Sequence, residues 1–146
     1  MRANLTDAEK YAYTAGVFDG EGCISIKKIN INKSVYTQYK PRLQVGSTDR
    51  KLINWLHATF GGCIYECSNK RHPTWKEYCL WELYNKEAVT RLIEGIYPYL
   101  NVKLPQAQTM LFFLNRDTLD TGQRWSDEMH RLNKKGRDES ELSEDE

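Results

Sequence analysis

The spacing of apolar residues changes along the chain between the period of a helix and that of a strand. Helical spacing predicts five helices, and alternation between turn residues predicts four strands. The predicted helices cover residues 7 to 19 or 20, 49–60, 87–97, 104–115 and 125–135, and the predicted strands cover 23–31, 38–45, 63–67 and 74–84. No internal repeat is present. The pattern therefore predicts one mixed domain built from helices and strands in that order.

Alternation is clearest in the second predicted strand. Apolar side chains such as Leu43 and Val45 would share one face, and a polar row would share the other: Gln38, Lys40, Arg42 and Gln44. Pro41 cannot donate a ladder hydrogen bond, so it predicts an edge strand or a bulge. In the first strand Ser25 and Lys27 would lie on the face opposite Ile24. The two strands together predict a sheet with one apolar and one polar face.

The first helix carries a clear start signal. Thr6 and Glu9 have the spacing of a capping box, in which each side chain satisfies a free N–H of the first turn. Inside the helix Gly16 costs roughly 1 kcal/mol relative to alanine. Small residues recur every four positions on one face, which we call the small-residue face: Ala8, Ala12, Gly16 and Gly20. Such a face lets a second backbone approach closely, which would offset the cost.

Glu21 lies at the predicted end of this helix, where a carboxylate meets the negative end of the helix dipole. A bound divalent cation would reverse that effect, because carboxylates and terminal carbonyls are both hard oxygen ligands. A close-packed helix pair would bring one such carboxylate from each helix to a common point. On the residues alone, the commoner alternative is a helix with a glycine C-cap followed by a strand.

Residues 14–22, with the sequence TAGVFDGEG, resemble the signature of the LAGLIDADG homing-endonuclease family. Thr14 replaces the leading leucine and Gly20 replaces an alanine, whereas Glu21 stands at the position of the catalytic acid. Residues 45–62 resemble the family's passage from a strand into the second helix. Residues 97–103 resemble the entry to its closing helix, where a lysine near the active site is expected. The resemblance spans about Tyr11 to Leu114.

The resemblance implies an α+β fold in the order α-β-β-α-β-β-α, with a curved antiparallel DNA-binding sheet and additional C-terminal helices. Members of the family pair two signature helices, either within one long chain or between two short ones. This chain has one signature, so the resemblance implies a homodimer that reads a palindromic or pseudopalindromic site. The small-residue face would form the dimer interface.

The same resemblance implies the active-site residues. Glu21 would hold Mg²⁺ (or Mn²⁺), with the carbonyl of Gly20 as a further ligand, for phosphodiester hydrolysis. Lys103 would offset charge that develops on the phosphate; the alternative is an ordinary surface lysine at a helix start. Ser47 or Thr48 falls near the water-ordering position, where the family often carries a longer polar side chain. Asp19 is expected to bind backbone groups at the helix interface and not the metal.

DNA readout is expected from the outward face of the sheet, set over the major groove. The polar row supplies the main candidates, joined by Ser25 and Lys27, and Lys70 and Arg71 would reach phosphates or outer bases. The alternative for any one of these residues is a solvated strand face. Glu66 and Glu82 are expected on this same face, where a carboxylate is unfavourable beside phosphate, although glutamate can accept a hydrogen bond from cytosine.

The formal charge of +1 conceals an uneven distribution. Six acidic and no basic residues lie within 138–146, and removing them leaves 21 basic against 14 acidic residues, a charge of +7 for residues 1–137. The basic part is expected to form the single DNA-binding domain. The acidic segment 138–146 is expected to be a disordered tail that is either simply solvated or shields the basic surface.

The four cysteines raise the question of a zinc site that would also include His72. Cys63 and Cys67 fall on a predicted strand, where a separation of four residues spans roughly 13 Å. Both thiolates could not then reach one ion with Zn–S bonds of about 2.3 Å. We therefore expect free thiols in a reducing compartment, the cytoplasm or an organellar matrix, since no signal peptide or membrane-spanning run is evident.

Three functions remain in competition at this stage. The first is a homodimeric, Mg²⁺-dependent, site-specific double-strand DNA endonuclease encoded in a mobile intron or as a free-standing gene. The second is a DNA-binding protein or intron RNA maturase without cleavage activity, against which Glu21 and Lys103 argue. The third is a structural or interaction domain, which the polar row disfavours.

Overall fold

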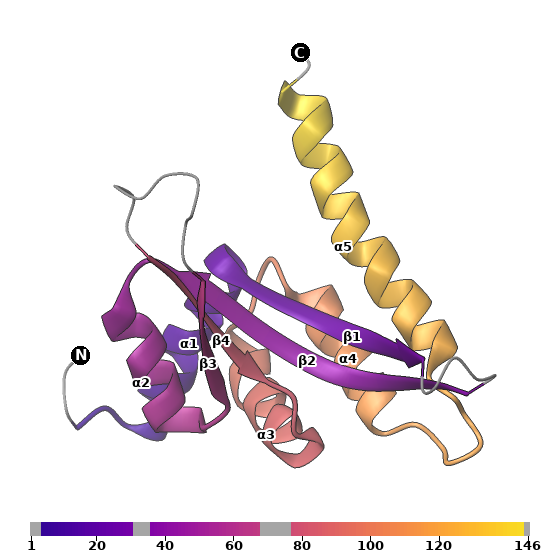
Figure 1. Cartoon of the computed structure of the whole chain (residues 1–146), viewed down its shortest axis with the longest axis horizontal. Helices are drawn as coiled ribbons and strands as arrows, with labels where there is room; N and C mark the ends of the chain where they lie inside the picture. Colours follow the sequence, from indigo (N-terminus) through magenta and orange to yellow (C-terminus); the bar gives the residue numbers. More distant parts are fainter. Residues whose placement is uncertain (1–3, 31–35, 68–76, 145–146) are drawn as a thin grey trace.

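The chain adopts the predicted order of helices and strands (Figure 1). The computed structural model describes residues 4–30, 36–67 and 77–144, with side chains to residue 134. The elements are α1 (Asp7–Glu21), β1 (Gly22–Asn30), β2 (Thr37–Ser47), α2 (Arg50–Phe60), β3 (Cys63–Cys67), β4 (Tyr78–Leu83), α3 (Lys86–Ile96), a 3₁₀ turn (Tyr97–Tyr99), α4 (Leu104–Leu114) and α5 (Gln123–Glu144). The α+β class is confirmed.

Local signals placed the ends of the first two helices. Thr6 and Glu9 form the predicted capping box, in which the Thr6 side chain accepts from the Glu9 N–H and the Glu9 carboxylate accepts from the Thr6 N–H. Asp49 caps α2, and Gly61 and Gly62 follow its last residue with φ values of 80° and 90°. These left-handed conformations suit glycine and end the helix where the sequence predicts.

The four strands form one antiparallel sheet in the order β1-β2-β4-β3. β2 pairs with β1 along the whole of β1, but with β4 only from Leu43 to Ser47. The long β1–β2 ribbon therefore extends beyond the shorter strands (Figure 1). The prediction of an edge strand from Pro41 is wrong for β2 as a whole. Proline is tolerated because Pro41 precedes the part of β2 that pairs with β4.

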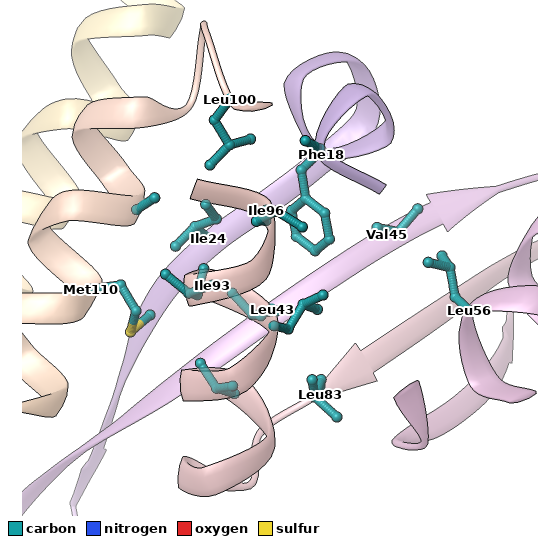
Figure 2. Packing of buried hydrophobic residues seen from close by; sticks show 14 of the residues in the cluster. Phe18, Ile24, Leu43, Val45, Leu56, Leu83, Ile93, Ile96, Leu100 and Met110 are labelled. Carbon is teal, nitrogen blue, oxygen red and sulfur yellow. The ribbon is translucent and has the colours of Figure 1, made fainter. Parts of the chain in front are cut away.

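The core lies between one face of the sheet and helices α1 to α4. Phe18, Ile24, Leu43 and Trp81 are fully buried there, and Figure 2 shows the first three converging with Ile96 from α3. Burying a side chain of this size contributes about 1.5–3 kcal/mol. Alternate residues of β4, namely Cys79, Trp81 and Leu83, are all buried. Packing on one face leaves the side chains of the other face directed to the surface.

Helix α5 packs along the edge of the sheet. Its Met129 is buried, and the Asn133 Nδ2 donates to the backbone oxygen of Ile24 in β1 at 3.1 Å. Trp125 stacks on Phe112 of α4 with ring centroids 5.4 Å apart. An edge strand presents unpaired backbone groups, and α5 satisfies one of them.

The final helix does not end at Lys135, as predicted, but continues to Glu144. Lysine, arginine, glutamate and leucine all favour helices, and no proline interrupts them. The C-terminal half of α5 leads away from the rest of the molecule (Figure 1). Within the described residues no helix has both the length and the apolar character needed to cross a membrane.

Candidate functional site

The small-residue face of α1 is open in the single chain. Ala8, Ala12, Gly16 and Gly20 are all exposed, and a Cβ added to either glycine would meet no atom within 4 Å. The opposite face of the helix buries Thr14, Ala15 and Phe18. Within the described residues no contact therefore offsets the helix-propensity cost of Gly16, which amounts to roughly 1 kcal/mol.

The end of α1 passes directly into β1. The Gly22 N–H donates to the Phe18 carbonyl, and Gly22 has φ −84° and ψ 159°. This backbone suits any residue, but a Cβ at Gly22 would lie 2.6 Å from the Phe18 Cα. Glycine is required here by close approach rather than by φ. The turn holds Glu21, which is exposed, between the last helical carbonyls and the first strand residue.

Asp19 joins this helix end to a segment distant in sequence. Its Oδ2 accepts from the Asn101 N–H and its Oδ1 from the Lys103 N–H, both at 2.9 Å. Lys103, the N-cap of α4, is half-buried. The prediction that Asp19 binds backbone is confirmed, but the donors belong to the approach to α4 rather than to a paired helix. The result is that Lys103 is held beside the helical turn that carries Glu21.

Ser47 lies at the same end of the sheet. β1 begins at Gly22, opposite Val45, so the last residues of β2 lie beside the α1–β1 junction. The Ser47 Oγ accepts from the Asp49 N–H at 3.0 Å, and Thr48 is exposed. Within the described residues the serine O–H donates no hydrogen bond. Three elements thus meet at this end of the sheet. They carry the sequence-predicted residues Gly20 and Glu21 (α1), Ser47 (β2) and Lys103 (the start of α4).

The carboxylate of Glu21 is unpaired at this end of the sheet. In the described part of the structure, the Glu21 carboxylate accepts no hydrogen bond and forms no ion pair. No group of three or more histidine, cysteine, aspartate or glutamate side chains within the described ranges could hold a metal ion. Glu21 and the Gly20 carbonyl are hard oxygen donors of the kind that Mg²⁺ takes, but they amount to part of a coordination sphere.

The outward face of the sheet carries the polar row. Register places Ser25 opposite Arg42 and Lys27 opposite Lys40. The Arg42 Nε donates to the Ser25 Oγ at 3.2 Å, while Lys27, Gln38 and Lys40 are exposed. The alternation predicted from the sequence is confirmed, since Leu43 and Val45 are fully buried. The face therefore presents cations and amides to the surface along the whole β1–β2 ribbon.

The sequence model of one family, the LAGLIDADG endonucleases, matches residues 14–109. The chain belongs to the LAGLIDADG endonuclease family. No curated protein matches the sequence.

Solved structures of LAGLIDADG homing endonucleases share the fold. I-CvuI in complex with its target in 2 mM Ca has a TM-score of 0.74 and 21% identity, over 88% of this chain and 85% of that one. A second I-CvuI complex, with the I-CreI target in 2 mM Mg and DNA not cleaved, scores 0.74 at 20% identity with the same coverage. The archaeal intron-encoded I-Vdi141I bound to DNA scores 0.66 at 19%, over 86% and 82%. Identities this low bear on the fold alone.

Within this LAGLIDADG chain, one expectation for the outward face is wrong. Glu82 does lie on that face, where its carboxylate accepts from the Gln44 Nε2 at 3.1 Å. Glu66 lies on the opposite face, because it pairs with the buried Cys79, and it forms an ion pair with Arg50 of α2 at 2.7 Å. The face of the sheet on which a residue of β3 lies depends on how β3 pairs with β4, and the sequence did not define that register. Lys70 and Arg71 lie outside the described residues.

The outward face of this LAGLIDADG sheet also carries tyrosines that sequence reasoning missed. Tyr65 and Tyr78 are nearly half exposed, and Tyr84 follows β4 with 53% of its surface exposed. The Tyr84 hydroxyl lies 3.8 Å from the Cys63 Sγ, and this hydrogen bond raises the pKa of Tyr84. The alternation of residues 78–84 is the signal that places Tyr78 and Tyr84 on the face opposite the buried residues of β4.

The cysteines of the LAGLIDADG sheet do not converge. Cys63 and Cys67 lie on one strand and on its outward face, whereas Cys79 is buried on the other face. All four cysteines are free thiols. His72 lies outside the described residues. The strand geometry used to argue against a shared zinc ion is confirmed.

Proposed function

We propose that this protein is a site-specific double-strand DNA endonuclease, a homing endonuclease that acts as a homodimer with a divalent metal ion. The observation that carries the proposal is the end of α1, where an open small-residue face leads to the unpaired Glu21 and Asp19 holds Lys103 alongside. The family supplies the reaction class. The solved relatives bound to DNA, two of them in Mg or Ca, support the substrate and the kind of ion.

The open small-residue face of α1 supports the proposed homodimer. Ala8, Ala12, Gly16 and Gly20 have no partner within the described chain, and a second α1 can approach such a face to backbone distance. A shallow hollow of about 540 Å³ beside this face is lined by Tyr13, Val17 and Leu52 among others. In a two-fold dimer these side chains would pack against the second copy on either side of the crossing α1 helices. The two copies of Glu21 would then meet at the two-fold axis.

The metal would be held by Glu21 and the Gly20 carbonyl, and the remaining ligands would come from the second copy, water and DNA. When bound, the ion polarises the scissile phosphate and an attacking water. Lys103 would place its ammonium near the charge that develops on the phosphate, because Asp19 fixes its backbone. The free O–H of Ser47 would orient water at the same end of the sheet.

DNA would lie along the outward face of the sheet. Gln38, Lys40, Arg42 and Gln44 would read base edges in the major groove, together with Ser25 and Lys27. Arginine and lysine favour guanine, and glutamine favours adenine. Two copies related by a two-fold axis would read a long pseudopalindromic site.

The proposal is tested by cleavage of a randomised-site plasmid library with Mg²⁺, with sequencing of the new ends. The Glu21→Gln variant removes the metal-binding charge at constant shape, and Glu94→Gln, an exposed residue of α3, makes the same change away from the site. We expect ends that share a two-fold-related consensus for the parent protein and for Glu94→Gln, and none for Glu21→Gln.

Other outcomes would redirect the assignment. Cleavage that persists in Glu21→Gln would show that the wrong acid is assigned. Equal DNA enrichment by parent and Glu21→Gln proteins, without cutting and without dependence on divalent ions, would favour the binding protein or the intron RNA maturase.

A further inference from the structure

A cavity of about 470 Å³ lies beside the outer half of β2, away from the end of α1. Its lining includes Lys40 of β2, Tyr84 and Lys86 at the start of α3, and Arg116 and Asp120 of the segment between α4 and α5. The cavity exists because β4 ends at Leu83, opposite Leu43, so the outer half of β2 has no strand on that side. The segment between α4 and α5 covers this gap only in part.

The wall formed by that segment is fixed by its own hydrogen bonds. The Arg116 Nε donates to the Asp120 backbone oxygen at 3.1 Å and its Nη1 to the Phe113 oxygen at 2.9 Å. The guanidinium carbon also lies 4.1 Å from the centroid of the Phe113 ring. Arg116 is therefore held in one orientation against the cavity.

The two carboxylates of the cavity are already engaged. Asp120 accepts from the Gly122 N–H at 2.8 Å, which lowers the pKa of Asp120, and its other oxygen lies 3.3 Å from Arg124. Asp117 accepts from the N–H of Leu119 at 3.4 Å. Neither carboxylate forms an ion pair with a cation of the cavity.

The cations, in contrast, have no anionic partner. Within the described residues, neither Lys40, Lys86 nor Arg116 forms an ion pair. Lys40 also belongs to the polar row on the outward face of the sheet, so the cavity opens beside the surface assigned to DNA. A cavity with three unpaired cations, next to such a surface, fits a phosphate group.

We propose that this cavity binds a backbone phosphate of the DNA, outside the base pairs that the sheet reads. The inference rests on the proposed function and extends it to residues of α3 and the α4–α5 segment. Lys86 and Arg116 would hold the phosphodiester oxygens, and Lys40 would contact the adjoining nucleotide. Phosphate contacts position a protein on the duplex without carrying sequence information. The cavity therefore sets register and affinity, and the polar row sets base preference.

The test compares Lys86→Gln with Arg91→Gln, which makes the same charge change on the same helix but faces a separate cavity between α1, α2 and α3. Equilibrium binding of the full chain to cognate and scrambled duplexes is measured from about 50 to 200 mM salt. Each lost phosphate contact lowers the slope of log affinity against log salt by about 0.9. We expect Lys86→Gln to lose this amount per protomer, about 1.8 for the homodimer, equally on both duplexes. Its affinity should then fall roughly twelvefold less across the salt range.

The result that would overturn the inference is a slope for Lys86→Gln equal to that of Arg91→Gln and of the parent protein. Inorganic phosphate serves as a second probe. If phosphate binding depends on Lys86 while the DNA slope does not, the cavity takes a free anion and the inference is wrong. If the parent protein fails to bind DNA at all, the proposed function fails instead, so the two failures are distinguishable.

Discussion

The carboxylate of Asp19 accepts the backbone N–H of Lys103, although the two residues lie far apart in the sequence. A second hydrogen bond from Asn101 makes the contact bidentate. Because Asp19 belongs to the last turn of α1, this contact fixes the start of α4 to the helix that ends at Glu21. In the proposed active site Asp19 would act as a positioning residue, because it fixes the backbone of Lys103 relative to the turn that carries Glu21.

Asp19→Asn is expected to reduce cleavage while DNA binding is kept. The amide retains one acceptor but turns its NH₂ toward the second N–H, so one of the two hydrogen bonds is lost at about 1 kcal/mol. Misplacement of Lys103 should then lower the cleavage rate by roughly tenfold to a hundredfold. Single-turnover cleavage and gel-shift affinity, measured side by side, separate the two effects.

Asp127→Asn is the control, because Asp127 is exposed on α5. It should match the parent in both assays. A proportional loss of binding and cleavage in Asp19→Asn would indicate that the whole site is disturbed, and would contradict a role in positioning Lys103.

The open small-residue face predicts a selective effect of Ala12→Leu. Ala12 is exposed in the single chain, so a larger side chain should leave the fold intact. At a close helix crossing it would cost about 1–3 kcal/mol, roughly 5- to 150-fold in the dimer dissociation constant. Sedimentation equilibrium measures that constant. Ala58→Leu makes the same change on the exposed side of α2 and should have no effect; equal behaviour of both variants would place the dimer interface elsewhere.

Sequence reasoning succeeded where local chemistry decides the structure. The capping box of Thr6 and Glu9 located the start of α1, and Gly61 with Gly62 located the end of α2. Alternation gave the two faces of β2, because one face is packed against helices. Each of these signals acts within a few residues, so the sequence contains it directly.

Features that depend on distant pairing could not be predicted in the same way. The face of Glu66 follows from its register with Cys79, and the partners of Asp19 follow from how α4 approaches α1. The cavity that includes Lys86 and Arg116 exists because β4 is shorter than β2. None of these relationships leaves a local pattern. The end of α5 was predicted too early for another reason, because an acidic segment without proline is compatible with either a helix or irregular structure.

Gly22 and Gly20 are expected to respond in opposite ways to alanine. A Cβ at Gly22 would lie 2.6 Å from the Phe18 Cα, so the turn into β1 must shift, at a cost of about 1–3 kcal/mol. A Cβ at Gly20 meets nothing within 4 Å, and alanine should stabilise the helix by up to about 1 kcal/mol. Urea unfolding at a protein concentration that favours monomer gives both values. A stable Gly22→Ala variant would mean that the α1–β1 junction is looser than this geometry implies.

Glu82 and Glu66 were expected on the same face of the sheet but lie on opposite faces. This difference predicts different effects of the two residues on DNA binding. Glu82 places a negative charge on the outward face, where it is bonded to Gln44. Glu82→Gln should raise affinity for scrambled duplex several-fold, because a repulsive charge beside phosphate is removed. If Glu82 accepts a hydrogen bond from a cytosine, the variant should also lower discrimination at that base pair, where a good hydrogen bond is worth about 1–3 kcal/mol. Glu66→Gln loses only an exposed ion pair with Arg50, worth at most about 1 kcal/mol of stability, and should leave DNA binding unchanged.

Fluorescence anisotropy on matched cognate and scrambled duplexes measures both the affinity and the discrimination of each variant. If Glu66→Gln strengthens DNA binding as much as Glu82→Gln, the DNA does not distinguish the two faces of the sheet, and the outward face is not its binding surface.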